Sequence, residues 1–367
     1  MKHYMPVRVY SGEGAVEKNA GLFAGFGARC ALITGRSSAV KSGALADVTK
    51  ALDNAGIPYC VYDEIAQTPS VRSCIAAGRK AHAFGAAFVI GIGGGSALDA
   101  AKAAAVFAAN PALEEEGFYR KQWQNAPLPI LLVGTTAGTG SEVTKVSVLT
   151  DSAGRKHSIH DDRLFAAAAF GDPKYTTALP LPITLSTGID VLSHCAESYF
   201  NRNADEVSRA FAIRGIRLLY VPLLDAAEGR ELGRAQREAL YDASLLGGLA
   251  ICGTGTCFPH NVGYYLTENR GVPHGFASAR VLPSMLRLVE EKDPAYAERF
   301  FEELGIGREP LLRLIRLCLP ENGITMTAEE IAAALPRWEN NNSVRNTCCA
   351  VSAAEIREIL EQQFLKN

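Results

Sequence analysis

The chain has 367 residues, a length that favours two domains over a single small one. Hydrophobic residues make up 48% and charged residues 21%, the balance of a globular protein with a sizeable core. With 37 basic and 39 acidic residues the formal net charge is -2, and no basic run stands out. This charge pattern argues against a nucleic acid or a membrane surface as partner.

The sequence carries no sign of export. No segment is long and apolar enough to span a bilayer, and the first residues lack the apolar core of a signal peptide. The nine cysteines are scattered without a Cys-x-x-Cys pair, which favours reduced thiols over a disulfide framework, and the adjacent Cys348-Cys349 is a poor candidate for a structural bridge. We therefore expect a cytoplasmic protein.

Short apolar runs alternate with helical patterns in the first half of the chain. The runs at 31–34, 59–62, 87–92 and 129–133 predict strands, and the segment 39–55 predicts a helix between the first two. The run at 87–92 is continuously apolar, as expected of a strand whose two faces are both covered. Strands alternating with helices predict a mostly parallel sheet with helices on both sides.

The second half of the chain has a different character. From about Leu181 onward there is almost no strand pattern, and helical patterns follow one another to the end. Two capping boxes and the apolar face of the last helix mark this part: Thr327 with Glu330, Ser352 with Glu355, and Ile356, Ile359, Leu360 and Phe364. We predict an α/β domain over residues 1–178 followed by an all-helical domain over residues 179–367.

A glycine-rich turn, Gly93-Gly94-Gly95-Ser96, connects the strand at 87–92 to a helix that begins near Ala97. Glycines let backbone N–H groups approach a ligand closely, and the helix N-terminus adds a partial positive charge. A pyrophosphate fits there, with Asp99 and Lys102 following on the helix. A tight turn without a ligand is the alternative, and the turn alone does not decide between the two.

A second loop, Thr135-Thr136-Ala137-Gly138-Thr139-Gly140-Ser141-Glu142, follows the strand at 129–133 and is rich in hydroxyls and small residues. Loops at the carboxyl ends of neighbouring parallel strands converge on one crevice, where ligands of such sheets bind. Two such loops in one chain favour a nucleotide ligand. Taken alone, the second loop is equally compatible with a solvent-facing Ser/Thr segment.

The second half contains three histidines, His194, His260 and His274. Asp190 and His194 are four residues apart, so on a helix they share a face and can hold one ion. Three imidazoles and one carboxylate suit a borderline divalent ion such as iron(II) or zinc. The alternative is an ordinary Asp–His pair on a helix and two unrelated loop histidines, and spacing alone leaves both open.

Together these segments resemble the iron-containing (group III) alcohol dehydrogenase family along essentially the whole chain. The motifs that carry the resemblance are Gly93-Gly94-Gly95-Ser96 with Asp99 and Lys102, Thr135 to Glu142, Thr187-Gly188-Ile189-Asp190 through His194 and Glu197, His260, and Pro273-His274-Gly275. The resemblance implies a dehydroquinate synthase-like fold, with a dinucleotide-binding α/β domain, an all-helical metal-binding domain and a metal in the cleft between them. The family's metal ligands match Asp190, His194, His260 and His274. The Asp-x-x-x-His form favours the alcohol dehydrogenase branch over glycerol dehydrogenases and dehydroquinate synthase.

The resemblance also implies a reaction: a metal, Fe²⁺ foremost and Zn²⁺ as the alternative, polarises the oxygen of a small alcohol or aldehyde while NAD or NADP exchanges a hydride with its carbon. The expected cofactor-binding residues are Gly93, Gly94, Gly95, Ser96 and Asp99 for the pyrophosphate, and Thr135, Thr136, Thr139 and Lys156 for the adenosine or ribose. Residues 6–10 resemble the family's amino-terminal strand, which pairs across subunits, and so imply a homodimer or an assembly of dimers. The rival interpretations are a dehydroquinate-synthase-like lyase and a non-catalytic nucleotide-binding relative.

Two departures from the family pattern bear on the chemistry. Many members have a histidine four residues after the third ligand, and here that position is Tyr264. Tyr264 is a candidate for proton transfer, with a packing role as the alternative. Many NAD-using members have an aspartate after the first strand, where this chain has Gly35, Arg36 and Ser37. A carboxylate there repels a 2′-phosphate, whereas Arg36 can pair with one. The sequence therefore predicts that NADP is accepted and preferred over NAD.

Overall fold

The computed structural model describes residues 3–321, 323–339 and 341–365, which pack as two compact units. An α/β unit consists of Tyr4–Pro180 and Gly233–Gly248, and a helical unit holds His3, Leu181–Leu232 and the described residues from Leu249 on. Helix α9 (Arg234–Thr254) therefore begins in the first unit and ends in the second. The sequence pattern does not indicate that α9 belongs to both units, because its helical pattern does not differ from those of the helices around it.

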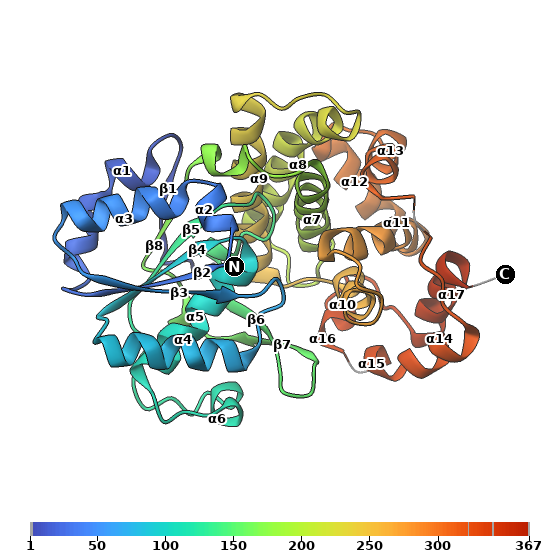
Figure 1. Ribbon diagram of the computed structural model, residues 1–367. Coiled ribbons are helices and arrows are strands. Elements are labelled where there is room, and N and C mark those ends of the chain that lie inside the picture. Colours follow the sequence, from blue (N-terminus) through green and yellow to red (C-terminus); the bar gives the residue numbers. More distant parts are fainter. Residues whose placement is uncertain (1–2, 322, 340, 366–367) are drawn as a thin grey trace. The chain divides into compact units, whose positions relative to one another are not determined.

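The α/β unit is built on a six-stranded parallel sheet (Figure 1). Its strands in spatial order are β1 (Arg8–Ser11), β8 (Ala168–Gly171), β5 (Ile130–Gly134), β4 (Phe88–Gly93), β2 (Cys30–Gly35) and β3 (Tyr59–Ile65). The predicted strands are β2, β3, β4 and β5. Strand β8 was not expected from the sequence, because its residues Ala-Ala-Phe-Gly have little β-propensity and the strand is short.

The strand order creates a topological switch point between β2 and β4. The chain leaves β2 toward β3 at one edge of the sheet, but it leaves β4 toward β5 in the opposite direction. The parallel register pairs residues 30–34 of β2 with residues 88–92 of β4, so the strand ends at Gly35 and Gly93 lie side by side. Ligands of open α/β sheets bind outside the carboxyl ends of the strands at such a point.

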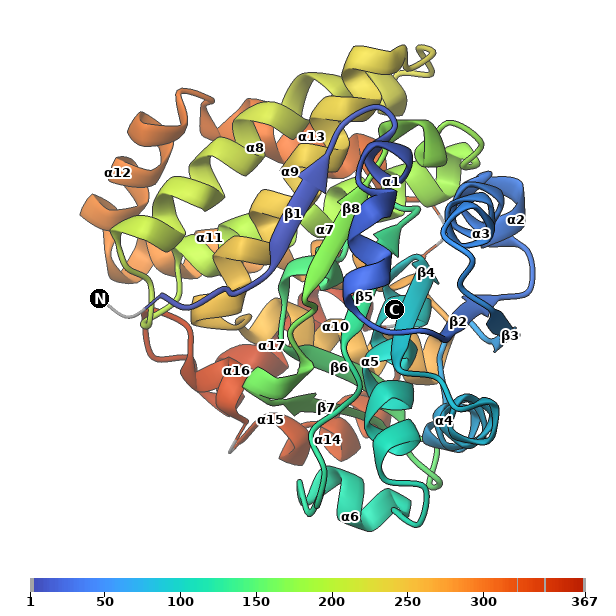
Figure 2. The ribbon, with the colours of Figure 1, turned by 90° about the vertical axis from the view of Figure 1, so that its left-hand side faces the viewer.

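Helices cover both faces of the sheet, as expected (Figures 1 and 2). Helices α1 (Ala15–Lys18), α2 (Ser38–Lys41) and α3 (Ala44–Asn54) enclose one face in a core with the buried side chains of Leu32, Ile90 and Phe170. Helices α4 (Val71–Phe84) and α5 (Gly95–Ala109) pack on each other across the other face. The helix expected over 39–55 is split in two, because Gly43 takes φ +82° between α2 and α3.

Two peripheral elements complete the α/β unit. Helix α6 (Glu115–Tyr119) follows α5, and a hairpin of β6 (Val146–Thr150) and β7 (Lys156–His160) follows the second loop. Neither was expected from the sequence. The hairpin strands are short and polar on their exposed residues, so no apolar run marks them.

The helical unit contains no strand among its described residues, as the sequence predicted. Its helices are α7 (Leu181–Tyr199), α8 (Glu206–Ala227), α10 (Phe258–Arg270), α11 (His274–Lys292), α12 (Pro294–Leu304), α13 (Arg308–Cys318), α14 (Ala328–Ala334), α15 (Pro336–Glu339), α16 (Asn342–Arg345) and α17 (Ala353–Phe364). Both predicted capping boxes are present, at the starts of α14 and α17, and the apolar face of α17 is buried. None of the helices in the described part of the chain has the length and apolar character that crossing a membrane requires.

Candidate metal centre and nucleotide site

Helix α7 presents three polar side chains on one buried face. Asp190, His194 and Glu197 follow one another at spacings of four and three residues, which place them on the same side of a helix. All three are at most 5% exposed. The Nε2 atom of His194 lies 3.9 Å from Oδ2 of Asp190, so the carboxylate and the imidazole expected to act together do lie together.

His260 and His274 each stand in the first turn of a helix rather than in a loop. His260 follows Pro259 at the start of α10, and His274 is the first residue of α11. Their Nε2 atoms lie 3.5 and 3.9 Å from Oδ1 of Asp190. Ligand atoms of Asp190, His260 and His274 all lie within 4.8 Å of one another, and the His194 ring stacks on that of His260 at 4.7 Å between centroids. The four residues expected to bind a metal are thus gathered in one place.

A close contact between α7 and α11 brings His274 to Asp190. Gly275 follows His274, and a Cβ atom built on it would lie 1.9 Å from the backbone oxygen of Ser186 on α7. Gly263 similarly permits α10 to approach Ser278 of α11, since its Cβ would lie 2.6 Å from that hydroxyl. Side chains larger than hydrogen at these two positions would hold the helices apart.

Glu197 orients His260 from behind. Its Oε1 lies 2.5 Å from Nδ1 of His260, while its Oε2 accepts the backbone N–H of Cys257 at 2.8 Å. Because an ionised carboxylate only accepts hydrogen bonds, Nδ1 carries the hydrogen and Nε2 is left to face Asp190. Sequence analysis assigned no role to Glu197, although its place seven residues after Asp190 was the available signal.

The electrostatics of this group favour a cation. Burial alone lowers the pKa of His260, but Glu197 and Asp190 outweigh it and raise the pKa to about 10. Burial would raise the pKa of Asp190, but the imidazoles, His194 first, hold it well below its usual range. Burial raises the pKa of Glu197. Asp190 and Glu197 thus favour positive charge at His260, and a bound cation is a suitable source of that charge.

Two of the converging atoms have no hydrogen-bond partner among the described residues: Oδ1 of Asp190 and Nε2 of His260, both buried. Unpartnered buried polar atoms are rare and costly in proteins. Three imidazole nitrogens and a carboxylate oxygen are suitable ligands for Fe²⁺ or Zn²⁺. The residues present therefore fit a divalent transition metal.

Replacing Glu197 with glutamine should weaken metal binding about ten- to a hundredfold, the usual effect of losing such an outer partner. The amide keeps the size of the side chain but removes the negative charge beside the Nδ1–H of His260. Titration with Zn²⁺ or Co²⁺ measures the change. The control is Glu303→Gln, which alters a carboxylate bound to Tyr199 in the same unit and should leave affinity unchanged. Equal affinities in the two variants would contradict the role given to Glu197.

The two loops expected to bind a nucleotide lie against each other at the switch point of the sheet. The backbone N–H of Thr135 donates to the carbonyl of Gly93 at 2.9 Å. A Cβ atom on Gly94 would lie 3.0 Å from Thr136, and one on Gly95 would lie 2.6 Å from Thr139. The hydroxyl of Thr135 is buried without a hydrogen-bond partner among the described residues. Helix α5 starts at Gly95, so its unpaired first N–H groups face this cradle.

Asp99 and Lys102 hold the second loop from α5. The carboxylate of Asp99 accepts a hydrogen bond from the Ser141 hydroxyl at 2.5 Å and another from the backbone N–H of Val148 at 2.9 Å. The fully buried ammonium of Lys102 donates to the carbonyls of Ser141 and Val146 at 2.8 and 2.7 Å. Burial raises the pKa of Asp99 even beside Lys102. One helix therefore fixes the phosphate loop, the second loop and the hairpin to each other.

The other predicted residues are placed as follows. Gly35 ends β2, where a Cβ atom would lie 3.1 Å from the carbonyl of Ile65. Arg36 and Ser37 follow it and are exposed, and Arg36 makes no hydrogen bond or ion pair with the described residues. Lys156 is the first residue of β7, outside the two loops. Tyr264 lies one turn after His260 on α10, and its ring stacks on that of His274 at 5.0 Å and 7°.

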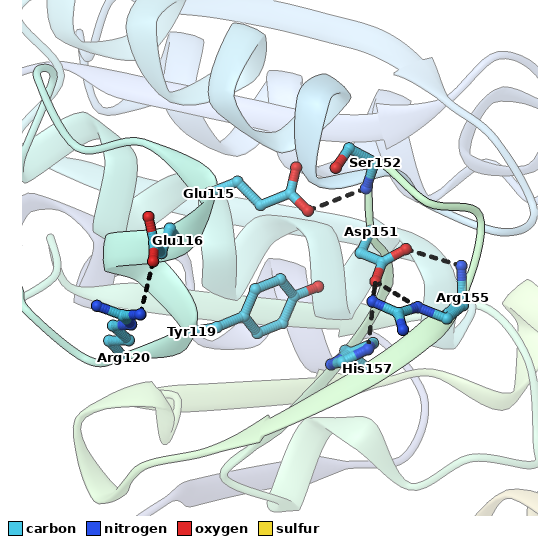
Figure 3. A pocket seen from close by; sticks show the side chains of 8 residues that line it. All are labelled: Glu115, Glu116, Tyr119, Arg120, Asp151, Ser152, Arg155 and His157. Carbon is cyan, nitrogen blue, oxygen red and sulfur yellow. Dashed lines mark hydrogen bonds and ion pairs between the residues drawn. The ribbon is translucent and has the colours of Figure 1, made fainter.

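A separate polar pocket of about 420 Å³ lies between α6 and the hairpin (Figure 3). Its charged groups neutralise one another: Asp151 binds Arg155 at 3.1 Å and His157 at 3.2 Å, and Glu116 binds Arg120 at 2.7 Å. None of the residues expected to bind metal or nucleotide lines it.

Comparisons with known proteins agree with this arrangement. Residues 6–173 match the family model described as iron-containing alcohol dehydrogenase, and residues 184–310 match the C-terminal model of the same family. The chain is 32% identical over 283 residues to the sulfoacetaldehyde reductase of Bilophila wadsworthia, covering 77% of this chain and 73% of the relative. It is 33% identical over 276 residues to the 1,3-propanediol dehydrogenase of Citrobacter freundii, covering 71% and 70%.

Solved structures extend the similarity to the whole fold. The iron-containing alcohol dehydrogenase of Thermotoga maritima is 34% identical, with a TM-score of 0.91 over 99% of both chains. The sulfoacetaldehyde reductase of Bifidobacterium kashiwanohense, solved in complex with NAD⁺, is 26% identical, with a TM-score of 0.86 over 99% of this chain and 98% of the other. The resemblance and fold class predicted from the sequence are confirmed. The chain is an oxidoreductase that belongs to the iron-containing alcohol dehydrogenase family.

Proposed function

We propose that this protein is a metal-dependent, NAD(P)-linked alcohol dehydrogenase or aldehyde reductase that acts on a small alcohol or aldehyde. The observation that carries the proposal is the convergence of Asp190, His194, His260 and His274, with two buried ligand atoms that lack hydrogen-bond partners. The names of the relatives, which include a propanediol dehydrogenase and a sulfoacetaldehyde reductase, support small polar substrates.

The ligand residues prepare the helical unit for Lewis-acid chemistry. A divalent metal bound there supplies positive charge to an alcohol or carbonyl oxygen, and we propose Fe²⁺ foremost, with Zn²⁺ as the alternative. Glu197 keeps His260 in the tautomer that directs Nε2 to the metal. The stacked ring of Tyr264 restricts rotation of the His274 imidazole, and we assign Tyr264 this positioning role rather than proton transfer.

The nucleotide is proposed to bind to the α/β unit. Its pyrophosphate lies on the backbone N–H groups of Gly94, Gly95 and Ser96, where the start of α5 provides a partial positive charge. Thr135, Thr136, Thr139 and Lys156 are proposed to contact the ribose or adenosine. Asp99 acts through the loops that it holds, because both of its oxygens are already hydrogen-bonded.

The decisive experiment follows the absorbance of NADH and NADPH with short aldehydes, before and after removal of metal by a chelator. We expect turnover that disappears with the metal and returns when Fe²⁺ or Zn²⁺ is added. Full turnover without any bound metal would overturn the proposed metal dependence. Cofactor binding without turnover under every metal condition would instead indicate a non-catalytic relative.

We predict that NADP(H) is preferred over NAD(H) by roughly ten- to a hundredfold. The carboxyl end of β2 faces the switch point, and Gly35 there has no carboxylate to repel a 2′-phosphate. The unpaired guanidinium of Arg36 is free to bind a phosphate, a charge-assisted contact of roughly 1.5–3 kcal/mol, where each 1.4 kcal/mol is about tenfold. The ratio of kcat/KM for the two cofactors measures the preference.

Two variants separate the contributions to this preference. Arg36→Ala should remove most of it, and Gly35→Asp should reverse it, since the new Cβ needs only a small shift of the Ile65 carbonyl at 3.1 Å. The control is Lys41→Ala, which removes a different cation at the exposed end of α2 and should leave the cofactor preference nearly unchanged. A native preference for NAD(H) that neither variant alters would refute this account of the ribose site.

We also propose a homodimer, or an assembly of dimers, formed through β1. This strand pairs with β8 on one side and is the edge of the sheet on the other, with Val9 37% exposed. An unpaired edge strand invites pairing with another chain. Light scattering at micromolar concentration should give twice the mass of the chain, and Val9→Pro, which removes an edge N–H group, should shift it toward the monomer. A wild-type monomer would count against this assembly.

We place the protein in the cytoplasm. All nine cysteines are free thiols, and five of them are buried. Thiols without disulfide partners are typical of proteins kept in a reducing compartment.

A further inference from the structure

Cys348 and Cys349 form a pair of adjacent thiols outside any helix or strand. Both residues lie in a bend after the isolated bridge between Thr347 and Asn201, and both side chains are half-buried. The backbone N–H of Cys348 donates to the carbonyl of Phe200 at 2.8 Å, which fixes the start of the bend. The two thiols lie within hydrogen-bonding reach of each other.

A lysine stabilises negative charge at the second thiol. Lys292 at the end of α11 donates to the carbonyl of Ala350, the residue after Cys349, at 2.5 Å, and it also forms an ion pair with Glu355 at 2.5 Å, which partly offsets its effect on Cys349. The hydrogen bond with Cys348 first, and the Lys292 charge after it, lower the pKa of Cys349 to about 7 despite partial burial. The same hydrogen bond raises the pKa of Cys348. Cys349 therefore ionises more readily than an ordinary cysteine, and the Cys348 thiol next to it keeps its proton.

The other thiols of the chain differ from this pair. Burial raises the pKa of Cys74 and Cys318 to about 12, and raises that of Cys60 as well, although Cys60 is also half-buried. Reactivity follows thiolate character and exposure together. Cys60 is thus a suitable internal comparison for Cys349, since it is also half-buried and also lies next to a residue whose carbonyl binds a lysine, Lys80, but it has no adjacent cysteine.

The geometry of adjacent residues makes any disulfide here a reversible one. Consecutive Cα atoms lie about 3.8 Å apart across a trans peptide. Ordinary disulfides join Cα atoms about 4.4–6.8 Å apart, and shorter spans store strain that makes the bond easier to reduce. Strained, accessible disulfides are labile or regulatory rather than structural.

We propose that Cys348 and Cys349 form a redox-reactive dithiol, at which a peroxide converts the two thiols into a vicinal disulfide. The Cys349 thiolate attacks one peroxide oxygen; the O–O bond breaks, Cys349 becomes a sulfenic acid, and the leaving oxygen takes up a proton as water or an alcohol. The Cys348 thiol then attacks the Cys349 sulfur, the S–S bond forms and a second water leaves. The two thiols lose two electrons in total and the peroxide gains them.

The test exposes the full-length reduced protein to hydrogen peroxide with an iron chelator present. Trypsin releases residues 346–357 as one peptide that holds both cysteines, between Arg345 and the cleavage after Arg357. We expect this peptide to become lighter by two hydrogens and to recover with dithiothreitol, at a rate about tenfold above the oxidation of Cys60. Oxidation of Cys349 no faster than that of Cys60, or without the loss of two hydrogens, would overturn the proposal.

Two variants assign the roles within the pair. In Cys348→Ser the sulfenic acid on Cys349 should persist and be trapped by dimedone, because the thiol that resolves it is missing. In Cys349→Ser the remaining Cys348 should stay reduced under the same conditions. If dimedone instead labels Cys348 in the Cys349→Ser protein and does not label Cys349 in the Cys348→Ser protein, the roles are reversed and the proposed mechanism is contradicted. Peptide mapping of the wild-type protein needs neither variant, so the test survives a folding defect in either one.

Discussion

Replacing His260 with alanine should remove the metal from the protein and lower turnover by about a thousandfold or more. The imidazole is one of the four converging side chains proposed to bind the metal, and Glu197 orients it. Its loss also leaves Asp190 and Glu197 buried without the group that neutralises them. Lewis-acid stabilisation contributes several kcal/mol, and each 1.36 kcal/mol is about tenfold in rate. Metal content by mass spectrometry and kcat/KM with a short aldehyde measure the two effects.

Controls must separate loss of metal from loss of fold. The proposed nucleotide site lies in the α/β unit, whereas His260 belongs to the helical unit, so nucleotide affinity should survive the substitution. His82→Ala is the matched control, because His82 lies on α4 and its one hydrogen bond among the described residues is to the backbone carbonyl of Ala108. Asp190→Asn should reproduce the loss of metal without removing a ring. Wild-type activity in a metal-free His260→Ala protein would refute the proposed metal centre.

Physical reasoning from the sequence predicts one part of the proposed metal site, and only the family resemblance predicts the rest. The Asp190–His194 pair follows from helical spacing, since residues four apart share a face. No spacing argument brings His260 and His274 to the same place, because that depends on how α10 and α11 pack on α7. The glycines that allow this packing, Gly263 and Gly275, have no periodic pattern that would reveal their role.

The sequence likewise predicts only part of the sheet. The strands predicted from the sequence are β2 to β5, which are three of the four inner strands and one edge strand of the sheet. Strand β8 and the β6–β7 hairpin were not expected, because their stability comes from neighbours in the sheet and from α5 rather than from local composition. Tertiary context of this kind overrides strand propensity.

Asp99 and Lys102 illustrate what a motif leaves undetermined. Both follow the phosphate loop in sequence, which invites the interpretation that they contact the ligand. In the structure their hydrogen-bonding groups are directed to Ser141, Val146 and Val148. A buried ammonium needs such partners, and only the position of the second loop shows where they come from.

Replacing Gly275 with alanine should lower metal affinity and kcat/KM by about a hundredfold. The added Cβ would lie 1.9 Å from the backbone oxygen of Ser186 and 2.9 Å from Cβ of Asp190. A backbone atom cannot rotate away, so the start of α11 has to move off α7, and His274 moves with it because it precedes Gly275 directly. A ligand displaced by about 1 Å is enough to cost about a hundredfold in catalysis. The helix propensity that alanine gains, about 1 kcal/mol, does not offset overpacking of about 1–3 kcal/mol.

A second glycine of the same unit provides the control for this prediction. A Cβ atom on Gly323 would meet no atom within 4 Å, so Gly323→Ala should keep wild-type metal affinity and melting temperature. Zinc or cobalt titration gives the affinity, and thermal unfolding in excess metal and in chelator separates the two effects. A displaced ligand makes the Gly275→Ala protein gain less stability from added metal than the wild type does, because stabilisation by a ligand grows with its affinity. Unchanged stabilisation by metal in this variant would show that α11 can shift without carrying His274 away from Asp190.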